Sequence, residues 1–193
     1  MRISSALFVA ILVSCSNDGG VNSTEQAKQA YLGLDESIDK AITLGFEGFN
    51  AASSANIPTE QTTGDLSGTM EVTGQVDQGV SANKQMRLLE TLTTYSDTDA
   101  GIVYDTSSDA GTDGAPAALG MSLQGIPTGT LSGSLDGTYG MSGALNGLVT
   151  LSVTFNGQLE PNDAGGVERK PGSTHITGTA VSGNGTYPID VTK

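Results

Sequence analysis

Two side chains that often do chemistry occur once each in this chain of 193 residues, the thiol of Cys15 and the imidazole of His175. A single thiol cannot form a disulfide within the chain, and one cysteine with one histidine is too few for most zinc sites. A Ser-His-Asp triad would need His175, but no Gly-x-Ser-x-Gly segment is present, and His175 lies in an expected strand beside Thr174 and Ile176. We therefore expect no enzyme, no catalytic residue and no cofactor. The chemistry of Cys15 depends on its place in the chain.

Acidic side chains crowd a polar stretch that ends at Pro116. Loops rich in carboxylate oxygen can hold calcium, which makes Asp97, Asp99 and Asp105 the candidate ligands. Their spacing lacks the third acid and the distal glutamate of an EF-hand. We therefore interpret the stretch as a solvated loop and expect no metal.

Cys15 stands at the end of an N-terminal apolar segment. Met1 and Arg2 give a short positive start, and an apolar run follows from Ile3 to Val13. This run is too short to span a bilayer, which takes about 20 apolar residues. Its length and charge are typical of a secretory signal, which has to be left out of any argument about the fold.

The end of this segment, Leu12, Val13, Ser14 and Cys15, resembles the lipobox of bacterial lipoproteins. In that motif a leucine-type residue stands three positions before an invariant cysteine, with small residues between them, and Val13 is within the tolerated range. The resemblance implies that residues 1–14 are a lipoprotein signal peptide and that the thiol of Cys15 accepts a diacylglyceryl group. Two or three acyl chains, palmitate among them, give stable membrane anchoring.

Residues 15–22 read as the lipidated cysteine and a polar, flexible tether. The residue after the cysteine is Ser16, where an aspartate would retain a lipoprotein in the inner membrane of enterobacteria-like cells. By this resemblance we expect a place in the cell envelope, at the outer membrane in a cell that has one.

The net charge of −13 and the pI near 4.1 limit the possible partners. Such a domain repels phosphate backbones, so we expect no nucleic-acid partner. Anionic lipid headgroups repel it as well, so its membrane partner must be reached through the covalent lipid on Cys15.

Residues 23–193 read as one domain, which begins with a helix over residues 23–50. Ser23 is placed to cap this helix, with Gln26 three residues on, as in a capping box. Apolar residues recur at spacings of three and four. They are Ala27, Ala30, Tyr31, Leu34, Ile38, Ala41, Ile42, Phe46 and Phe49. The acids and lysines, among them Asp35, Asp39 and Lys40, fall largely on the other face and predict a solvent side.

From Ile57 onward the apolar residues alternate with polar ones, which predicts half-buried strands over residues 57–193. Between Leu131 and Leu159 the odd positions are apolar or glycine and the even positions are almost all polar. One strand of that length would run roughly 95 Å, so the chain must turn while it keeps its phase. Turn signals lie at Asp136–Gly137, Asn146–Gly147 and Asn156–Gly157. Loops with an odd number of residues preserve the phase, so we expect three-residue loops with a left-handed glycine.

These patterns predict an α+β, mainly β fold. The N-terminal amphipathic helix packs on a curved antiparallel meander of about eight strands, as a half-barrel or a barrel-like sheet. We expect a non-enzymatic envelope lipoprotein with a structural or interaction role and an envelope protein as partner. The alternative is a carrier for a lipid or another apolar ligand held between helix and sheet, which rests on analogy of fold alone.

Overall fold

The computed structural model describes residues 19–77, 81–163 and 165–193. Two α-helices precede ten strands, and a 3-10 turn, η1 (Ser108–Ala110), follows the fourth strand. The helices are α1 (Thr24–Leu32) and α2 (Asp35–Ala51). The strands are β1 (Asn56–Thr63), β2 (Ser67–Val76), β3 (Lys84–Ser96), β4 (Ile102–Asp105), β5 (Ala117–Gln124), β6 (Thr130–Gly143), β7 (Gly147–Pro161), β8 (Val167–Arg169), β9 (His175–Ser182) and β10 (Gly185–Thr192).

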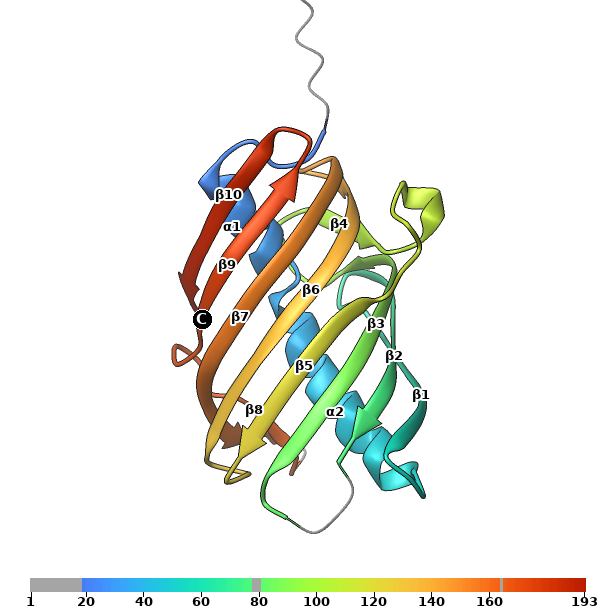
Figure 1. Ribbon diagram of the computed structural model, residues 1–193, viewed down its shortest axis with the longest axis vertical. Helices are drawn as coiled ribbons and strands as arrows, with labels where there is room; N and C mark the ends of the chain where they lie inside the picture. The colour runs from blue at the N-terminus through green and yellow to red at the C-terminus, as the bar shows by residue number, and fades with distance from the viewer. Residues whose placement is uncertain (1–18, 78–80, 164) are drawn as a thin grey trace, which may run out of the picture.

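The strands form one antiparallel sheet in which neighbours along the chain are mostly neighbours in space (Figure 1). Between β3 and β6 two strands share one place in the order. β5 pairs with the first part of β3 and of β6, and β4 pairs with their other ends, through Tyr95 opposite Tyr104 and Met141 opposite Tyr104. The short β8 pairs with the last residues of β7.

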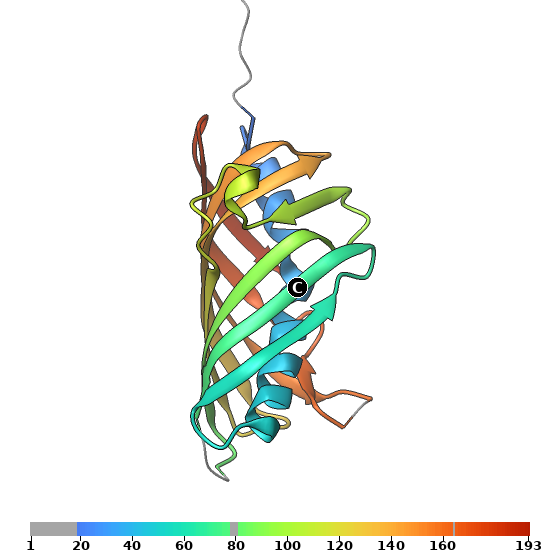
Figure 2. The ribbon, with the colours of Figure 1, turned by 90° about the vertical axis from the view of Figure 1, so that its right-hand side faces the viewer.

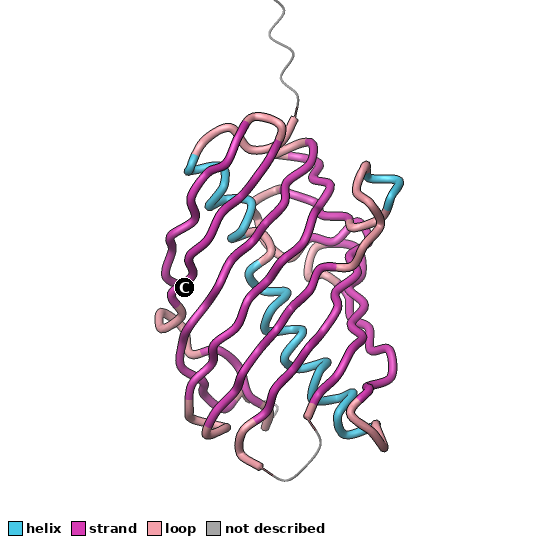
Figure 3. Tube along the Cα trace, viewed as in Figure 1, coloured by secondary structure: helices cyan, strands magenta, loops and turns pink. Residues whose placement is uncertain are grey.

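The sheet curves around the helices, which run diagonally along its inner face (Figures 2 and 3). Among the described residues β1 pairs only with β2 and β10 only with β9, so these two strands are the edges of the sheet. α2 packs against β1 and α1 against β10. The helices thus cover the opening between the edges, and the ring is completed by helix instead of by strand pairing.

The alternation predicted from the sequence is present in the packing. Every odd-numbered apolar residue from Leu131 to Leu159 is buried, with Leu135, Tyr139, Val149, Leu151 and Phe155 fully so. Leu34, Ile38 and Ile42 of the helical segment are also fully buried, while Phe46 and Phe49 are partly buried against the same core. The predicted fold class, mainly β with an N-terminal helix on a curved antiparallel sheet, is confirmed. The number of strands is ten instead of about eight, since β4 and β8 are too short to show alternation.

The predicted helix over residues 23–50 begins as expected and then bends. The Ser23 hydroxyl accepts the backbone N–H of Gln26 at 3.2 Å, which confirms the cap. The helix breaks at Gly33 and Leu34, where the N–H of Leu34 bonds to the carbonyl of Tyr31 three residues back. A Cβ on Gly33 would lie 2.3 Å from the hydroxyl of Tyr104. The bend therefore lies where the helix backbone comes closest to β4.

Two of the three predicted turns are wrong. Asp136–Gly137 lies inside β6 and Asn156–Gly157 inside β7, two long strands that pair with each other from Thr130 opposite Gln158 to Met141 opposite Gly147. The chain does turn at residues 144–146, a three-residue loop followed by Gly147 with a φ of +96°. There the predicted odd loop length and left-handed glycine are confirmed.

Candidate functional site

The lipobox residues Leu12, Val13, Ser14 and Cys15 lie outside the described residues, which begin at Gly19. The segment directly after that point is docked on the end of the sheet. Val21 is fully buried, and its carbonyl accepts the Ser182 hydroxyl at 2.6 Å. The N–H of Gly20 bonds to the carbonyl of Asn146. The expectation of a flexible tether through residue 22 therefore needs correction, because Asn146, Ser182 and Asn184 of the β6–β7 and β9–β10 hairpins bind Gly20 and Val21.

This docking needs close approach of two backbones. A Cβ built on Gly147 would lie 2.5 Å from the carbonyl carbon of Gly19, and one built on Gly20 would lie 2.8 Å from the carbonyl oxygen of Leu148. Glycines on both sides of the contact let the N-terminal segment lie flat on the turn. The sequence signal for this contact is the pair Gly19 and Gly20.

The three calcium candidates take different roles. Asp97 is buried and is paired with Lys40, whose Nζ lies 2.6 Å from Oδ1, and its other oxygen accepts the hydroxyl of Tyr95. Asp105 accepts the backbone N–H of Ser107 at 2.7 Å. Asp99 is exposed. Among the residues that the structure describes, no group of three or more Asp, Glu, His or Cys side chains is placed to hold a metal ion.

Lys40 joins Asp97, Asp65 and Thr63 into one hydrogen-bonded cluster. Besides Asp97 it donates to Oδ1 of Asp65 at 2.8 Å and to the carbonyl of Thr63 at 3.0 Å. Burial alone would lower the pKa of Lys40, but hydrogen bonds to Asp65 and Asp97 and their charges raise it. This cluster fastens α2 to the ends of β1 and β3.

His175 opens β9 and is half-exposed, with its Nε2 2.9 Å from Oδ1 of Asp190 on the neighbouring strand β10. This pair lies on the surface of the sheet. An exposed pair of this kind contributes little to stability.

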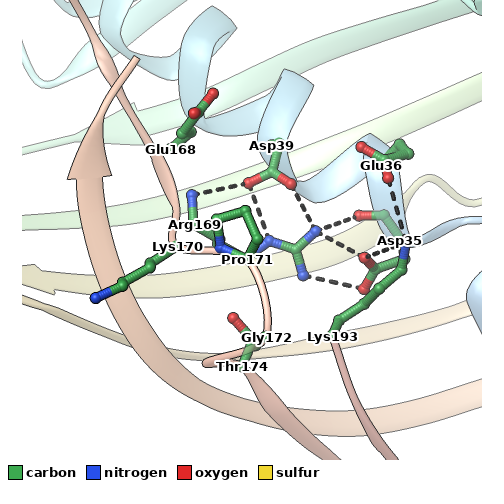
Figure 4. A pocket seen from close by; sticks show the side chains of 10 residues that line it. All are labelled: Asp35, Glu36, Asp39, Glu168, Arg169, Lys170, Pro171, Gly172, Thr174 and Lys193. Atoms are coloured by element: carbon green, nitrogen blue, oxygen red, sulfur yellow. Dashed lines mark hydrogen bonds and ion pairs between the residues drawn. The ribbon is translucent and has the colours of Figure 1, made fainter.

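A pocket of about 360 Å³ opens where β8 crosses the start of α2 (Figure 4). Its lining is mostly charged and comprises Asp35, Glu36, Asp39, Glu168, Arg169, Lys170, Pro171, Gly172, Thr174 and Lys193. Arg169 lies at its centre with a side chain only 6% exposed. The sequence analysis placed Asp35 and Asp39 on a solvent face, and this is wrong for Asp35, which is 1% exposed.

Arg169 is bonded on all sides. Its Nη1 and Nη2 donate to the two carboxylate oxygens of Asp35 at 3.0 and 2.9 Å, and Nη2 also donates to Oδ2 of Asp39 at 2.7 Å. Its Nε donates to Oδ1 of Asp39 at 2.9 Å. Tyr31 donates its hydroxyl to Asp35 at 2.6 Å. A guanidinium held this way has little left to offer an anion, so the cluster acts as a latch between β8 and α2.

The pKa values of Arg169 and Tyr31 are both raised by their surroundings, as expected for groups held in this latch. Burial alone would lower the pKa of Arg169, but the hydrogen bonds and charges of Asp39 and Asp35 raise it above its ordinary value. Burial, helped by the charge of Asp35, raises the pKa of Tyr31. Both groups therefore keep one charge state across the whole pH range in which proteins work.

Glu90 is a buried acid that the sequence patterns did not lead us to predict. Glu90 stands on the inward face of β3 between Leu88 and Leu92 and is 0% exposed. The signal is present in the sequence, because Glu90 has the same parity as the apolar residues Met86, Leu88 and Leu92, all of which are buried.

No family model, no curated protein and no solved structure matches this chain. No helix among the described residues is both long and apolar enough to cross a membrane.

Proposed function

We propose that this protein is a bacterial envelope lipoprotein, anchored through Cys15, whose domain has a non-enzymatic interaction role close to the membrane surface. The observation that carries the proposal is the docking of Gly20 and Val21 on the end of the sheet. Cys15 precedes Gly19 by four residues, and an extended chain reaches at most about 3.6 Å per residue. An acylated Cys15 would thus hold the β6–β7 and β9–β10 turns within about 14 Å of the lipid.

The engagement of the charged side chains supports a non-enzymatic role. Arg169, Asp35 and Asp97 are buried charged groups around α2, and each is bonded within the domain. These bonds fasten the helix and use most of the hydrogen-bonding capacity of these groups.

The packing between helix and sheet favours an interaction role over the carrier alternative. Leu34, Ile38 and Ile42 fill the space that an apolar ligand would need, and each is fully buried. The pocket beside α2 has a charged lining around Arg169, which suits an apolar ligand poorly.

Replacement of Cys15 by serine in the full-length chain tests the proposal in a bacterial host. We expect wild type to incorporate a labelled fatty acid and to enter the detergent phase of Triton X-114, while Cys15→Ser stays unprocessed or remains in the aqueous phase. Ser16→Ala keeps the lipobox and should behave like wild type. Fatty-acid labelling and phase partitioning of Cys15→Ser that match wild type would refute the anchor.

A further inference from the structure

Glu90 lies in the most enclosed part of the sheet. Its partners across the strands are Val72 of β2 and Ala117 of β5, and both of these are 0% exposed. Neither carboxyl oxygen of Glu90 has a hydrogen-bond partner among the described residues. An ionised carboxylate in such a place would cost several kcal/mol, so the group stays protonated.

No described cation neutralises Glu90. On the same face of β3 the nearest cation along the strand is Lys84, six residues away or about 20 Å, and it stacks over the ring of Phe49 at 4.3 Å. The charged residues on α2 nearest the bend are all paired: Asp35 and Asp39 with Arg169, Glu36 with Lys193, and Lys40 with Asp97 and Asp65.

The titratable groups close enough to feel the charge of Glu90 are Tyr139 of β6 and Tyr95 of β3. Tyr139 is fully buried, and its hydroxyl has no partner among the described residues. Its ring stands edge-on to Tyr104 at 6.2 Å, and the Tyr104 hydroxyl donates to the carbonyl of Ala30 in α1 at 2.8 Å. Two aromatic rings thus connect the surroundings of Glu90 with the bend between the helices.

Water can reach Glu90 by two routes. Separation of β3 from β2 or β5 would break a ladder of backbone hydrogen bonds that spans most of each strand. Departure of the helices breaks side-chain contacts and the two ion-pair clusters at Arg169 and Lys40 but leaves the sheet intact. The second route disrupts fewer backbone hydrogen bonds between strands, which favours the helices as the part that opens.

We propose that the proton on Glu90 locks α1 and α2 onto the sheet, so that rising pH favours release of the helices. In the closed state burial raises the pKa of Glu90 to about 8. In the open state the carboxyl is hydrated and has an ordinary pKa near 4.5. The closed state therefore binds the proton more tightly, and its advantage is complete below about pH 4.5 and lost as the pH rises toward 8.

The proposal gives a definite pH profile. One proton is released on opening between these two values, so the opening constant rises by up to about tenfold per pH unit between roughly pH 5 and pH 8, about 3000-fold over the whole profile. Above roughly pH 8 the closed state also loses the proton and the profile flattens.

Amide hydrogen exchange of the folded protein, corrected for the intrinsic rate at each pH, measures this opening. We expect protection of peptides from α1 and α2 to fall with the stated slope while peptides from β6 and β7 keep theirs. Glu90→Gln keeps the shape of the side chain but cannot ionise. Glu90→Met offers an apolar substitute if the glutamine variant folds poorly. Both should give helix protection that is flat with pH. Glu47→Gln makes the same substitution at an exposed acid of α2 and should retain the wild-type slope.

Three results would overturn the proposal. They are helix protection in wild type that does not change with pH, the same slope in Glu90→Gln and Glu90→Met, and equal loss of protection in β6 and β7, which would mean unfolding of the whole domain.

Discussion

Arg169 and Asp35 are 134 residues apart in the chain and form a two-point ion pair, with both terminal nitrogens of the guanidinium within 3.0 Å of the two carboxylate oxygens. The pair closes the opening of the curved sheet, because Asp35 begins α2 and Arg169 ends β8. Its geometry leads to the first of four predictions.

Replacement of Arg169 by methionine leaves the carboxylate of Asp35 buried and without its cation. We expect the free energy of unfolding in urea to fall by about 3–5 kcal/mol. The control is Arg87→Met, whose partner Asp77 is about as exposed as Arg87 itself, and the loss there should stay below about 1 kcal/mol. Equal losses in the two variants would show that the latch does not hold the fold.

Lys40 plays the matching role on the other side of α2. Lys40→Met leaves the carboxylate of Asp97, whose side chain is 0% exposed, without its cation. We expect the free energy of unfolding to fall by about 2–3 kcal/mol in the same urea experiment. Asp65→Asn removes the exposed partner of Lys40, a side chain that is 66% exposed, and should cost less than about 1 kcal/mol. A larger effect at Asp65 than at Lys40 would contradict this ranking.

The bend between the helices depends on the absence of a side chain at Gly33. Gly33→Ala pushes a methyl group into the Tyr104 hydroxyl, and we expect destabilisation by about 1–3 kcal/mol. Tyr104→Phe alone loses one hydrogen bond to Ala30, about 1 kcal/mol. Because the phenylalanine removes the clashing oxygen, the double variant should lose less than the sum of the two. Simple additivity in thermal or urea unfolding would locate the strain elsewhere.

Gly147 tests the docking of the N-terminal segment. Gly147→Ala adds a Cβ against Gly19 at a φ of +96°, while Gly172→Ala adds one at a φ of +72° with nothing within 4 Å. Both variants should lose about 1 kcal/mol from backbone strain. Only Gly147→Ala should lose amide protection at Gly20 and Val21. Unchanged protection there would mean that the segment is held without this contact.

Alternation along the chain was enough to predict the sheet, its phase and its packing against a helix. The turns were harder to predict, since Asp-Gly and Asn-Gly pairs here serve both as turn residues and as sites of close packing. A Cβ on Gly137 would lie 2.5 Å from the Cβ of Ala117, and one on Gly157 would lie 2.5 Å from Oγ1 of Thr174. These glycines permit close packing of neighbouring segments, and only Gly147 follows a turn.

The latch could not have been predicted, because local pattern treats each helix residue by its own polarity. The sequence pattern around Asp35 predicts a solvent-exposed residue, because its partner Arg169 lies 134 residues away in the chain. Glu90 differs, as its parity alone placed it among buried residues and only its charge argued otherwise. A charged residue in phase with an apolar face is therefore a signal that merits a prediction of its own.

The order of the elements along the chain has a kinetic consequence. The first helix, α1, packs on the last strand, β10, and Val21 bonds to Ser182, 161 residues later. Contacts between segments so distant form slowly. The N-terminal part, made first, must therefore wait for the C-terminal hairpin before the domain can close.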